Sequence, residues 1–168
     1  IPAGTPVICG SSDSAAEDYG AGAIEPGDAI VKLATAGNVN VMTSEAHPHP
    51  QTLTYSHIVP GMWYTVSATN AAAVCQRWFR DLFCEAEKIQ AEKLGIKSFE
   101  LMDRLAEASP AGANGIFFHP YLQGERCPYW DSSLRGSFIG LGMGSSRGDM
   151  LRALLEGVAF SLRDCRRL

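Results

Sequence analysis

The sequence lacks the features that mark membrane, secreted and disulfide-stabilised proteins. No apolar run approaches the roughly 18 residues that cross a bilayer, and the first residues do not follow the charged-then-apolar pattern of a signal peptide. The 5 cysteines are odd in number and include no C-x-x-C pair, so neither a disulfide framework nor a zinc site is expected. These absences predict a reduced, cytoplasmic protein without a membrane partner.

Excess charge and internal repetition are also missing. The 168 residues carry 14 basic and 18 acidic side chains, a net charge of −4 at pH 7, and the basic residues are scattered until the last few positions. No nucleic-acid partner is therefore expected. With 46% hydrophobic and 19% charged residues and no low-complexity tract, the composition predicts one globular domain with a hydrophobic core.

Two common nucleotide-binding signatures are absent as well. No G-x-x-x-x-G-K-[ST] phosphate loop occurs in the chain. The glycine-rich run from Gly140 to Gly144 fails the G-x-G-x-x-G spacing, because Ser145 stands where the third glycine belongs. The 4 histidines have no partners at metal-ligand spacing, so no protein-built metal site is predicted. Any nucleotide site must be of another type.

Hydrophobic periodicity indicates a mixed α/β domain. Val7 to Cys9 is a short apolar run that suits a buried strand, and Ser11 to Ser14 then supplies helix-capping residues. Helices are expected over 71–94 and 98–108 and from about 147 onward; further strands are expected over 29–35, 39–43, 53–58, 63–69, 115–118 and 137–141.

The pattern makes two specific predictions, one for a turn and one for the buried face of a helix. Strands 29–35 and 39–43 are expected to join through Ala36-Gly37-Asn38, because Gly and Asn tolerate positive φ. The helix over 71–94 is expected to bury Val74 and Leu82 and to keep Glu87 on its exposed side.

Three segments have the residue types for chemistry, each with an ordinary structural alternative. Asp13 follows a strand end, where it could accept a proton from an attacking hydroxyl; alternatively it only caps its helix. The turn at 35–38 offers backbone N–H groups and a hydroxyl to a phosphate, or is an ordinary hairpin turn. The charged and aromatic loop over 125–135 either holds itself together or borders a site.

Four segments together resemble the FGGY family of carbohydrate kinases. Gly136 to Leu141, followed after seven residues by Asp149 to Glu156, matches the second signature of that family. Pro120 to Asp131 resembles its Gly-Glu-Arg-x-Pro-Tyr-Trp-Asp loop, in the form typical of xylulokinases. Ala72 to Leu82 resembles the helix after the hairpins, and Cys9 to Ala16 stands where members usually read Gly-Gly-Gly-Asp-Asn-Ala-Ala. The resemblance runs almost from end to end.

The resemblance implies a ribonuclease-H-like α/β fold, shared with actin and hexokinase, in which ATP and sugar meet between two closing lobes. Residues 1–168 would form part of the second, C-terminal lobe. The first lobe would precede Ile1, and the glycine-rich adenine motif would follow Leu168. We therefore expect both ends to be cuts, and we expect that this polypeptide alone does not phosphorylate a sugar.

The resemblance also assigns roles to residues. Asp13 aligns with the catalytic aspartate that takes the proton from the sugar hydroxyl, and Ser12 is expected beside it at the sugar. Thr35 and Gly37 align with the Thr-x-Gly hairpin that contacts the ATP phosphates. Ala73 stands where the N-terminal region of a helix approaches the nucleotide, and its dipole would favour phosphate there. ATP and Mg²⁺ are the implied cofactors.

D-xylulose is the acceptor that the Tyr-Trp-Asp loop favours. Ribulose, gluconate, glycerol and the autoinducer-2 sugar stay open, since Phe83 to Lys88 also resembles autoinducer-2 kinases. Ser11 and Ser12 replace glycines of the family and Ser14 replaces its Asn. These departures leave open a different class, a non-catalytic relative that binds nucleotide or a partner protein. A homodimer is compatible with the resemblance.

Overall fold

The computed structural model describes residues 1–166. One helix is followed by four strands, three helices and a 3₁₀ turn, and the chain then has two short strands and a long helix. In order, the elements are α1 (Asp13–Gly20), β1 (Ala29–Leu33), β2 (Gly37–Thr43), β3 (Leu53–Ser56), β4 (Trp63–Thr69), α2 (Ala73–Phe83), α3 (Glu85–Leu94), α4 (Ser98–Glu107), η1 (Ala113–Gly115), β5 (Phe117–His119), β6 (Ser137–Ile139) and α5 (Arg147–Cys165).

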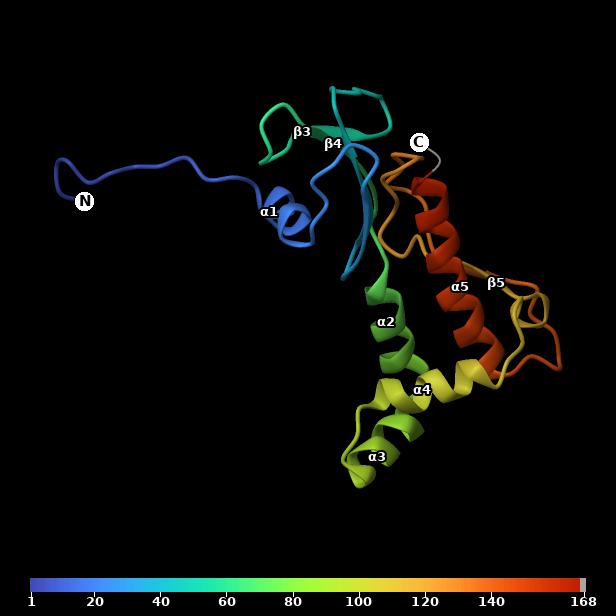
Figure 1. The fold of residues 1–168 in the computed structure, drawn as a ribbon. Coiled ribbons are helices and arrows are strands. Elements are labelled where there is room, and N and C mark those ends of the chain that lie inside the picture. Colours follow the sequence, from blue (N-terminus) through green and yellow to red (C-terminus); the bar gives the residue numbers. More distant parts are fainter. Residues whose placement is uncertain (167–168) are drawn as a thin grey trace.

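A four-stranded antiparallel sheet forms one end of the molecule (Figure 1), with the strand order β1-β2-β4-β3. The register pairs Val31 with Val39 between β1 and β2, and Gly37 with Thr69 between β2 and β4. The tip of the β1–β2 hairpin therefore lies at the end of the sheet where β4 stops and the chain leads into α2. That end holds one half of the candidate site.

Side chains alternate between the two faces of the sheet along each strand, and a helix packs on each face. One face packs against α1 and buries Met42, Tyr64, Val66 and Ala68 together with Ala15 of the helix. The other face turns to the long helix α5, which packs on β2 and β4. There Val39 joins Leu154, Val158 and Leu162 in a second core, which extends through α2, α4 and β5. The two cores fix α1 and α5 on opposite sides of one sheet.

Helix α5 begins at Arg147, as predicted, and has a capping box at its first turn. Ser146 accepts a hydrogen bond from the backbone N–H of Asp149 at 3.1 Å, while the Asp149 carboxylate accepts from the backbone N–H of Ser146 at 2.9 Å. Further along, Gly157 lies against β5, where an added Cβ would stand 2.2 Å from the carbonyl oxygen of Phe118. Only a glycine lets this helix approach the strand so closely.

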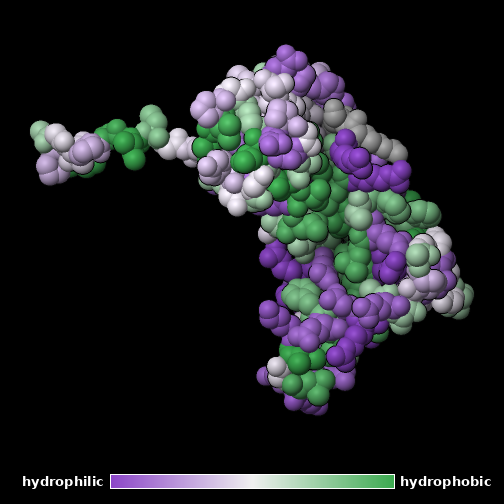
Figure 2. All heavy atoms as spheres, in the orientation of Figure 1, coloured by the Kyte–Doolittle hydropathy of each residue, from purple (hydrophilic) through white to green (hydrophobic). Residues whose placement is uncertain are grey.

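The predicted strand at Val7 to Cys9 is wrong. Val7 and Ile8 are each 89% exposed, and the segment runs extended, away from the body of the molecule (Figures 1 and 2). An apolar run becomes a strand only when a neighbouring strand pairs with its backbone, and none of residues 1–166 does so here. The helix predicted to follow is confirmed and begins at Asp13.

The single helix predicted over 71–94 is wrong in one respect, since it is two helices. α2 ends at Phe83 and α3 begins at Glu85, with Cys84 between them at φ −120° and ψ 40°. The carbonyl of Phe83 accepts a hydrogen bond from Arg147 at 2.8 Å, and Arg147 also forms an ion pair with Glu87 at 2.7 Å. Glu87 is therefore buried, contrary to the prediction, because its charge has a partner on α5.

The buried face of α2 also differs from the predicted one. Cys75 and Phe79 line the core, whereas Leu82 is 60% exposed. The remaining predicted helices and hairpins are present, with ends that differ by a few residues. None of the helices within residues 1–166 is both long and apolar enough to cross a membrane.

Candidate functional site

Asp13 is the first residue of α1 and has an exposed side chain. The helix is capped by Ser12, whose Oγ accepts from the backbone N–H of Ala15 at 3.2 Å. Asp13 Oδ1 accepts only a local hydrogen bond, from the backbone N–H of Ser14 at 2.9 Å. The alternative that Asp13 caps the helix is thus not what the structure has, and its carboxylate faces solvent.

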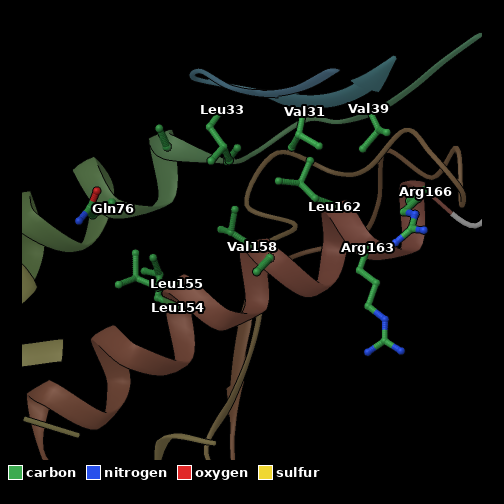
Figure 3. Close-up of a pocket in the computed structure, with 13 residues that line it drawn as sticks. Val31, Leu33, Val39, Gln76, Leu154, Leu155, Val158, Leu162, Arg163 and Arg166 are labelled. Atoms are coloured by element: carbon green, nitrogen blue, oxygen red, sulfur yellow. The ribbon is translucent and has the colours of Figure 1, made fainter. Parts of the chain in front are cut away.

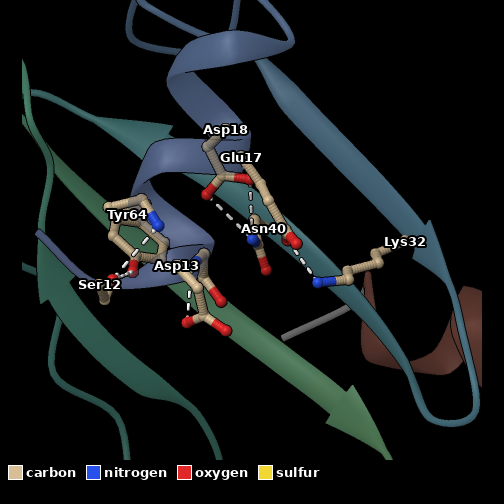
Figure 4. Close-up of polar contacts among 9 residues, drawn as sticks. Ser12, Asp13, Glu17, Asp18, Lys32, Asn40 and Tyr64 are labelled. Atoms are coloured by element: carbon tan, nitrogen blue, oxygen red, sulfur yellow. Dashed lines mark hydrogen bonds and ion pairs between the residues drawn. The ribbon is translucent and has the colours of Figure 1, made fainter.

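Ser12 has a second contact besides its capping role. Its Oγ lies 3.2 Å from the hydroxyl of Tyr64 on β4, which ties the start of α1 to the sheet (Figure 4). Tyr64 is buried, and burial raises the pKa of its hydroxyl. The Ser12 hydroxyl is therefore already engaged by the protein on both sides.

Thr35, Gly37 and Ala73 are brought together at the end of the sheet. The carbonyl of Thr35 accepts from the backbone N–H of Ala72 at 2.9 Å, and the carbonyl of Ala34 accepts from that of Ala73 at 2.9 Å. The hairpin thus covers the first amides of α2. Because the Ala73 N–H already has an acceptor, this helix end could attract an anion through its dipole but not through that donor.

Gly37 has a packing role in this cluster instead of the conformational one expected. It lies inside β2, and its φ is not among the positive values of the chain. An added Cβ would meet the Cβ of Ala72 at 3.1 Å and Cδ2 of Leu162 at 3.0 Å. The turn itself lies at 34–36, two residues earlier than predicted, and the glycine lets the hairpin close against α2 and α5.

Arg77 is a residue of this cluster that the sequence reasoning missed. Its Nη2 donates to the Oγ1 of Thr35 at 2.7 Å, and both residues are exposed. A guanidinium beside the hairpin adds the positive charge that the turn itself lacks, in the form best suited to phosphate oxygens. Its position four residues after Ala73 was the available signal, since that spacing places both on one face of a helix.

Asp13 and the hairpin cluster remain separate in this structure. Among residues 1–166 no hydrogen bond or ion pair joins Asp13 to Thr35, Gly37 or Ala73. Lys32 of β1 donates a hydrogen bond to the Glu17 carboxylate, which chiefly raises the pKa of its amine, and the charge of Asp13 adds a smaller effect in the same direction. The carboxylate therefore lies over the β1 side of the sheet, on the face that α1 covers.

The loop over 125–135 supports the end of the sheet. The carboxylate of Glu125 is buried and accepts hydrogen bonds from the backbone N–H of Asn70 at 2.8 Å and from the hydroxyl of Thr69. Trp130 Nε1 donates to the carbonyl of Gln51 at 3.0 Å. Glu125 thus fixes the junction between β4 and α2 with neutral donors. Because Thr69 also pairs with Gly37 in the sheet, the loop is attached beside the hairpin cluster.

An apolar groove of about 590 Å³ lies between the β1 edge, the start of α2 and α5 (Figure 3). Val31 and Leu33 form one wall, and they are 59% and 65% exposed. Leu155, Val158 and Leu162 line the opposite wall. Figure 2 shows the apolar surface gathered in this hollow. The groove has no carboxylate to act as a base, so its lining favours apolar contacts over catalysis.

Known carbohydrate kinases are similar to this chain in sequence. The family model "FGGY family of carbohydrate kinases, C-terminal domain" matches residues 31–167. The chain is 37% identical over 160 residues to a xylulose kinase of Staphylococcus epidermidis, covering 94% of this chain and 30% of that protein. It is 33% identical over 159 residues to a gluconokinase of Bacillus licheniformis, covering 94% of this chain and 31% of that protein.

The solved structures agree with the sequence relatives. The structure of xylulose kinase from Rhodospirillum rubrum superposes with a TM-score of 0.78 at 33% identity, over 97% of this chain and 31% of that chain. The mixed α/β fold described above is therefore shared with sugar kinases of the actin and hexokinase type. The chain spans about 31% of the length of the gluconokinase it matches.

Proposed function

The chain belongs to the FGGY family of carbohydrate kinases, and on that premise we propose that it is part of the C-terminal lobe of a longer, cytoplasmic sugar kinase. Asp13 is the general base in this proposal. The observation that supports it is the exposed Asp13 carboxylate at the start of α1. Ser12 caps this helix, so the Asp13 carboxylate is not needed for capping. The five free cysteines are compatible with a reducing compartment.

The reaction in this proposal is an in-line phosphoryl transfer. The Asp13 carboxylate takes the proton from the attacking hydroxyl of the sugar, whose oxygen forms the new bond to the γ-phosphorus of ATP. The bond to the bridging oxygen breaks, and ADP leaves with that electron pair. A positioned base contributes about 10²- to 10⁴-fold to such a step.

The hairpin cluster supplies the phosphate end of the proposed site. The exposed Thr35 hydroxyl and the Arg77 guanidinium would face the phosphate oxygens, and the N-terminus of α2 would add its dipole. Mg²⁺ is usually held by one or two carboxylates together with substrate phosphates. Residues 1–166 contain no preformed group of three His, Cys, Asp or Glu ligands, so the ion would enter with the ATP phosphates that hold it. When bound, the ion would neutralise charge on the phosphoryl oxygens.

The acceptor that we propose is D-xylulose, giving D-xylulose 5-phosphate. The Tyr-Trp-Asp loop and the 37% identity to a xylulose kinase over 160 residues support it. Gluconate is the second candidate, because a gluconokinase is 33% identical over 159 residues. The dimer expected from the resemblance stays a prediction.

The test is an acceptor screen with the full-length kinase that contains this chain, using ATP and Mg²⁺. D-xylulose is expected to give the highest kcat/KM among ketoses, aldonates and polyols. A higher value for gluconate would replace the acceptor and keep the kinase, whereas no acceptor-dependent ADP release with any of them would reject the proposal. Residues 1–168 alone are expected to release no ADP with any acceptor.

A further inference from the structure

Helix α1 is short and is held to the sheet by few polar contacts. It has 8 residues, and within residues 1–166 no hydrogen bond or ion pair joins the side chain of its proposed base, Asp13, to the sheet. At the first end, Ser12 reaches Tyr64 on β4. At the other end, Asp18 reaches Asn40 on β2 (Figure 4). These two contacts, Ser12–Tyr64 and Asp18–Asn40, are the polar anchors at the two ends of α1. The position of the Asp13 carboxylate therefore depends on the orientation in which they hold the helix.

The second anchor is a buried pair in an apolar layer. Asp18 is 1% exposed and Asn40 is 2% exposed. The single Nδ2 of Asn40 donates to both carboxylate oxygens of Asp18, at 3.0 Å and 2.9 Å. Ala15, Met42 and Tyr64 belong to the core on this face of the sheet. A carboxylate and an amide in such surroundings must be bonded to each other, because water cannot replace the lost partner.

The groups around the pair leave the Asp18 carboxylate dependent on Asn40. Burial raises the pKa of Asp18, and the hydrogen bond from Asn40 acts against that rise. Nδ1 of the nearby His57 accepts from the backbone N–H of Val59 at 3.0 Å, so a neutral ring has its proton on Nε2. That Nε2 and the Oδ1 of Asn40 are buried without a partner among the described residues. Among residues 1–166, the hydrogen bonds that the Asp18 carboxylate accepts come from Asn40.

We propose that Asp18 and Asn40 are positioning residues for the base Asp13, an inference that rests on the proposed kinase function. Asp18 lies five residues after Asp13, about 7.5 Å along the axis, so that a tilt of about 10° at the anchor moves Asp13 by about 1 Å. A displacement of about 1 Å can cost on the order of 100-fold in rate. The pair thus acts through the helix and touches no reacting atom.

The variants separate this role from simple packing. Asn40→Leu removes the donor at similar size, and Asp18→Ala removes the acceptor, so one remains informative if the other fails to fold. The exchange Asp18→Asn with Asn40→Asp restores a carboxylate–amide pair with its direction reversed. Glu17→Ala is the matched control, because Glu17 also links α1 to β1 through Lys32 but its side chain is 53% exposed.

The measurement is kcat per nucleotide-binding site in the full-length kinase, with sites counted by ADP titration. Asn40→Leu and Asp18→Ala are expected to lower this value about 10- to 100-fold, with KM for ATP within about threefold. The exchange variant is expected to recover it to within about threefold, and Glu17→Ala to stay within about twofold. A loss of folded protein alone would reduce binding sites and turnover together and leave their ratio unchanged.

A double-mutant cycle then tests whether the pair acts through the base. In an Asp13→Asn background, Asn40→Leu is expected to lower the residual single-turnover rate by less than about twofold. The same loss in both backgrounds, or an unchanged kcat per site in both single variants, would overturn the inference while the kinase stands. Full activity of Asp13→Asn would instead reject the base itself, so the two failures are distinguishable.

Discussion

Gly37 and Gly157 show how single residues without side chains determine the contacts of this fold. At Gly37 a Cβ would press on three side chains, Leu162 at 3.0 Å, Ala72 at 3.1 Å and Thr69 at 3.3 Å. At Gly157 it would stand 2.2 Å from a backbone oxygen of Phe118. Side chains can shift by a few tenths of an ångström, whereas a paired strand yields only by moving as a whole.

Alanine at these two positions is therefore expected to destabilise unequally. Gly37→Ala should lower the free energy of unfolding by about 1–2 kcal/mol and Gly157→Ala by about 3 kcal/mol, read from urea midpoints of the full-length protein. Gly142→Ala, where a Cβ meets nothing within 4 Å, is the control and should stay within about 0.5 kcal/mol. Equal losses at all three positions would contradict the packing account.

The start of α5 is an element whose stability should depend on pH. The Asp149 carboxylate accepts from Ser109 at 2.6 Å, from Asn114 at 2.8 Å and from the Ser146 hydroxyl at 2.7 Å. These hydrogen bonds, that of Ser109 first, lower the pKa of Asp149 from 3.8 to about 2. Because the folded pKa is depressed, the stabilisation is present above about pH 4 and is lost as the pH falls through about 2.

Asp149→Asn should consequently lower the urea midpoint at pH 7 and lower it less at about pH 3, since the wild-type protein is then losing the same contribution. The measurement is the difference between wild-type and variant midpoints at the two pH values. Glu107→Gln, which removes an exposed carboxylate from the end of α4, is the control. A difference that grows as the pH falls would show that the sign of this account is wrong.

The elements also show what local sequence can and cannot predict. The hairpins and α5 were predicted because their signals are local: runs of apolar residues at strand or helix spacing, separated by short turns. The break at Cys84 and the burial of Glu87 were missed because Arg147, 60 residues later, supplies the partner for both. The strand at Val7 to Cys9 was predicted from its apolar run alone, although strand formation depends on a neighbour.

The residues of the candidate site also fall into those that were identified from the sequence and those that were missed. The resemblance identified Thr35, Gly37 and Ala73, and the structure brings these three together at one end of the sheet. Arg77 and the Asp18–Asn40 pair were missed, because a side chain gains such a role only when a second element comes within reach of it. The contact between Arg77 and Thr35 spans 42 positions and that between Asp18 and Asn40 spans 22.

At the scale of the whole molecule, one sheet holds both halves of the proposed site. The base lies on the face covered by α1, and the phosphate hairpin lies at the sheet end where α2 begins. The apolar groove along β1 and α5 adjoins the phosphate hairpin, since Ala73 lines it, and is of the kind that marks interaction sites on protein surfaces. The matched part of the gluconokinase relative is 31% of its length, so turnover belongs to the full-length kinase in this account.

The most direct test of the central claim is the turnover of Asp13→Asn in the full-length kinase, measured with saturating ATP, Mg²⁺ and the best acceptor from the screen. The amide keeps the size and the hydrogen bond from Ser14 but cannot take up the proton. The account predicts a loss of kcat of about 10²- to 10⁴-fold with ATP affinity within about twofold. An unchanged kcat would contradict it.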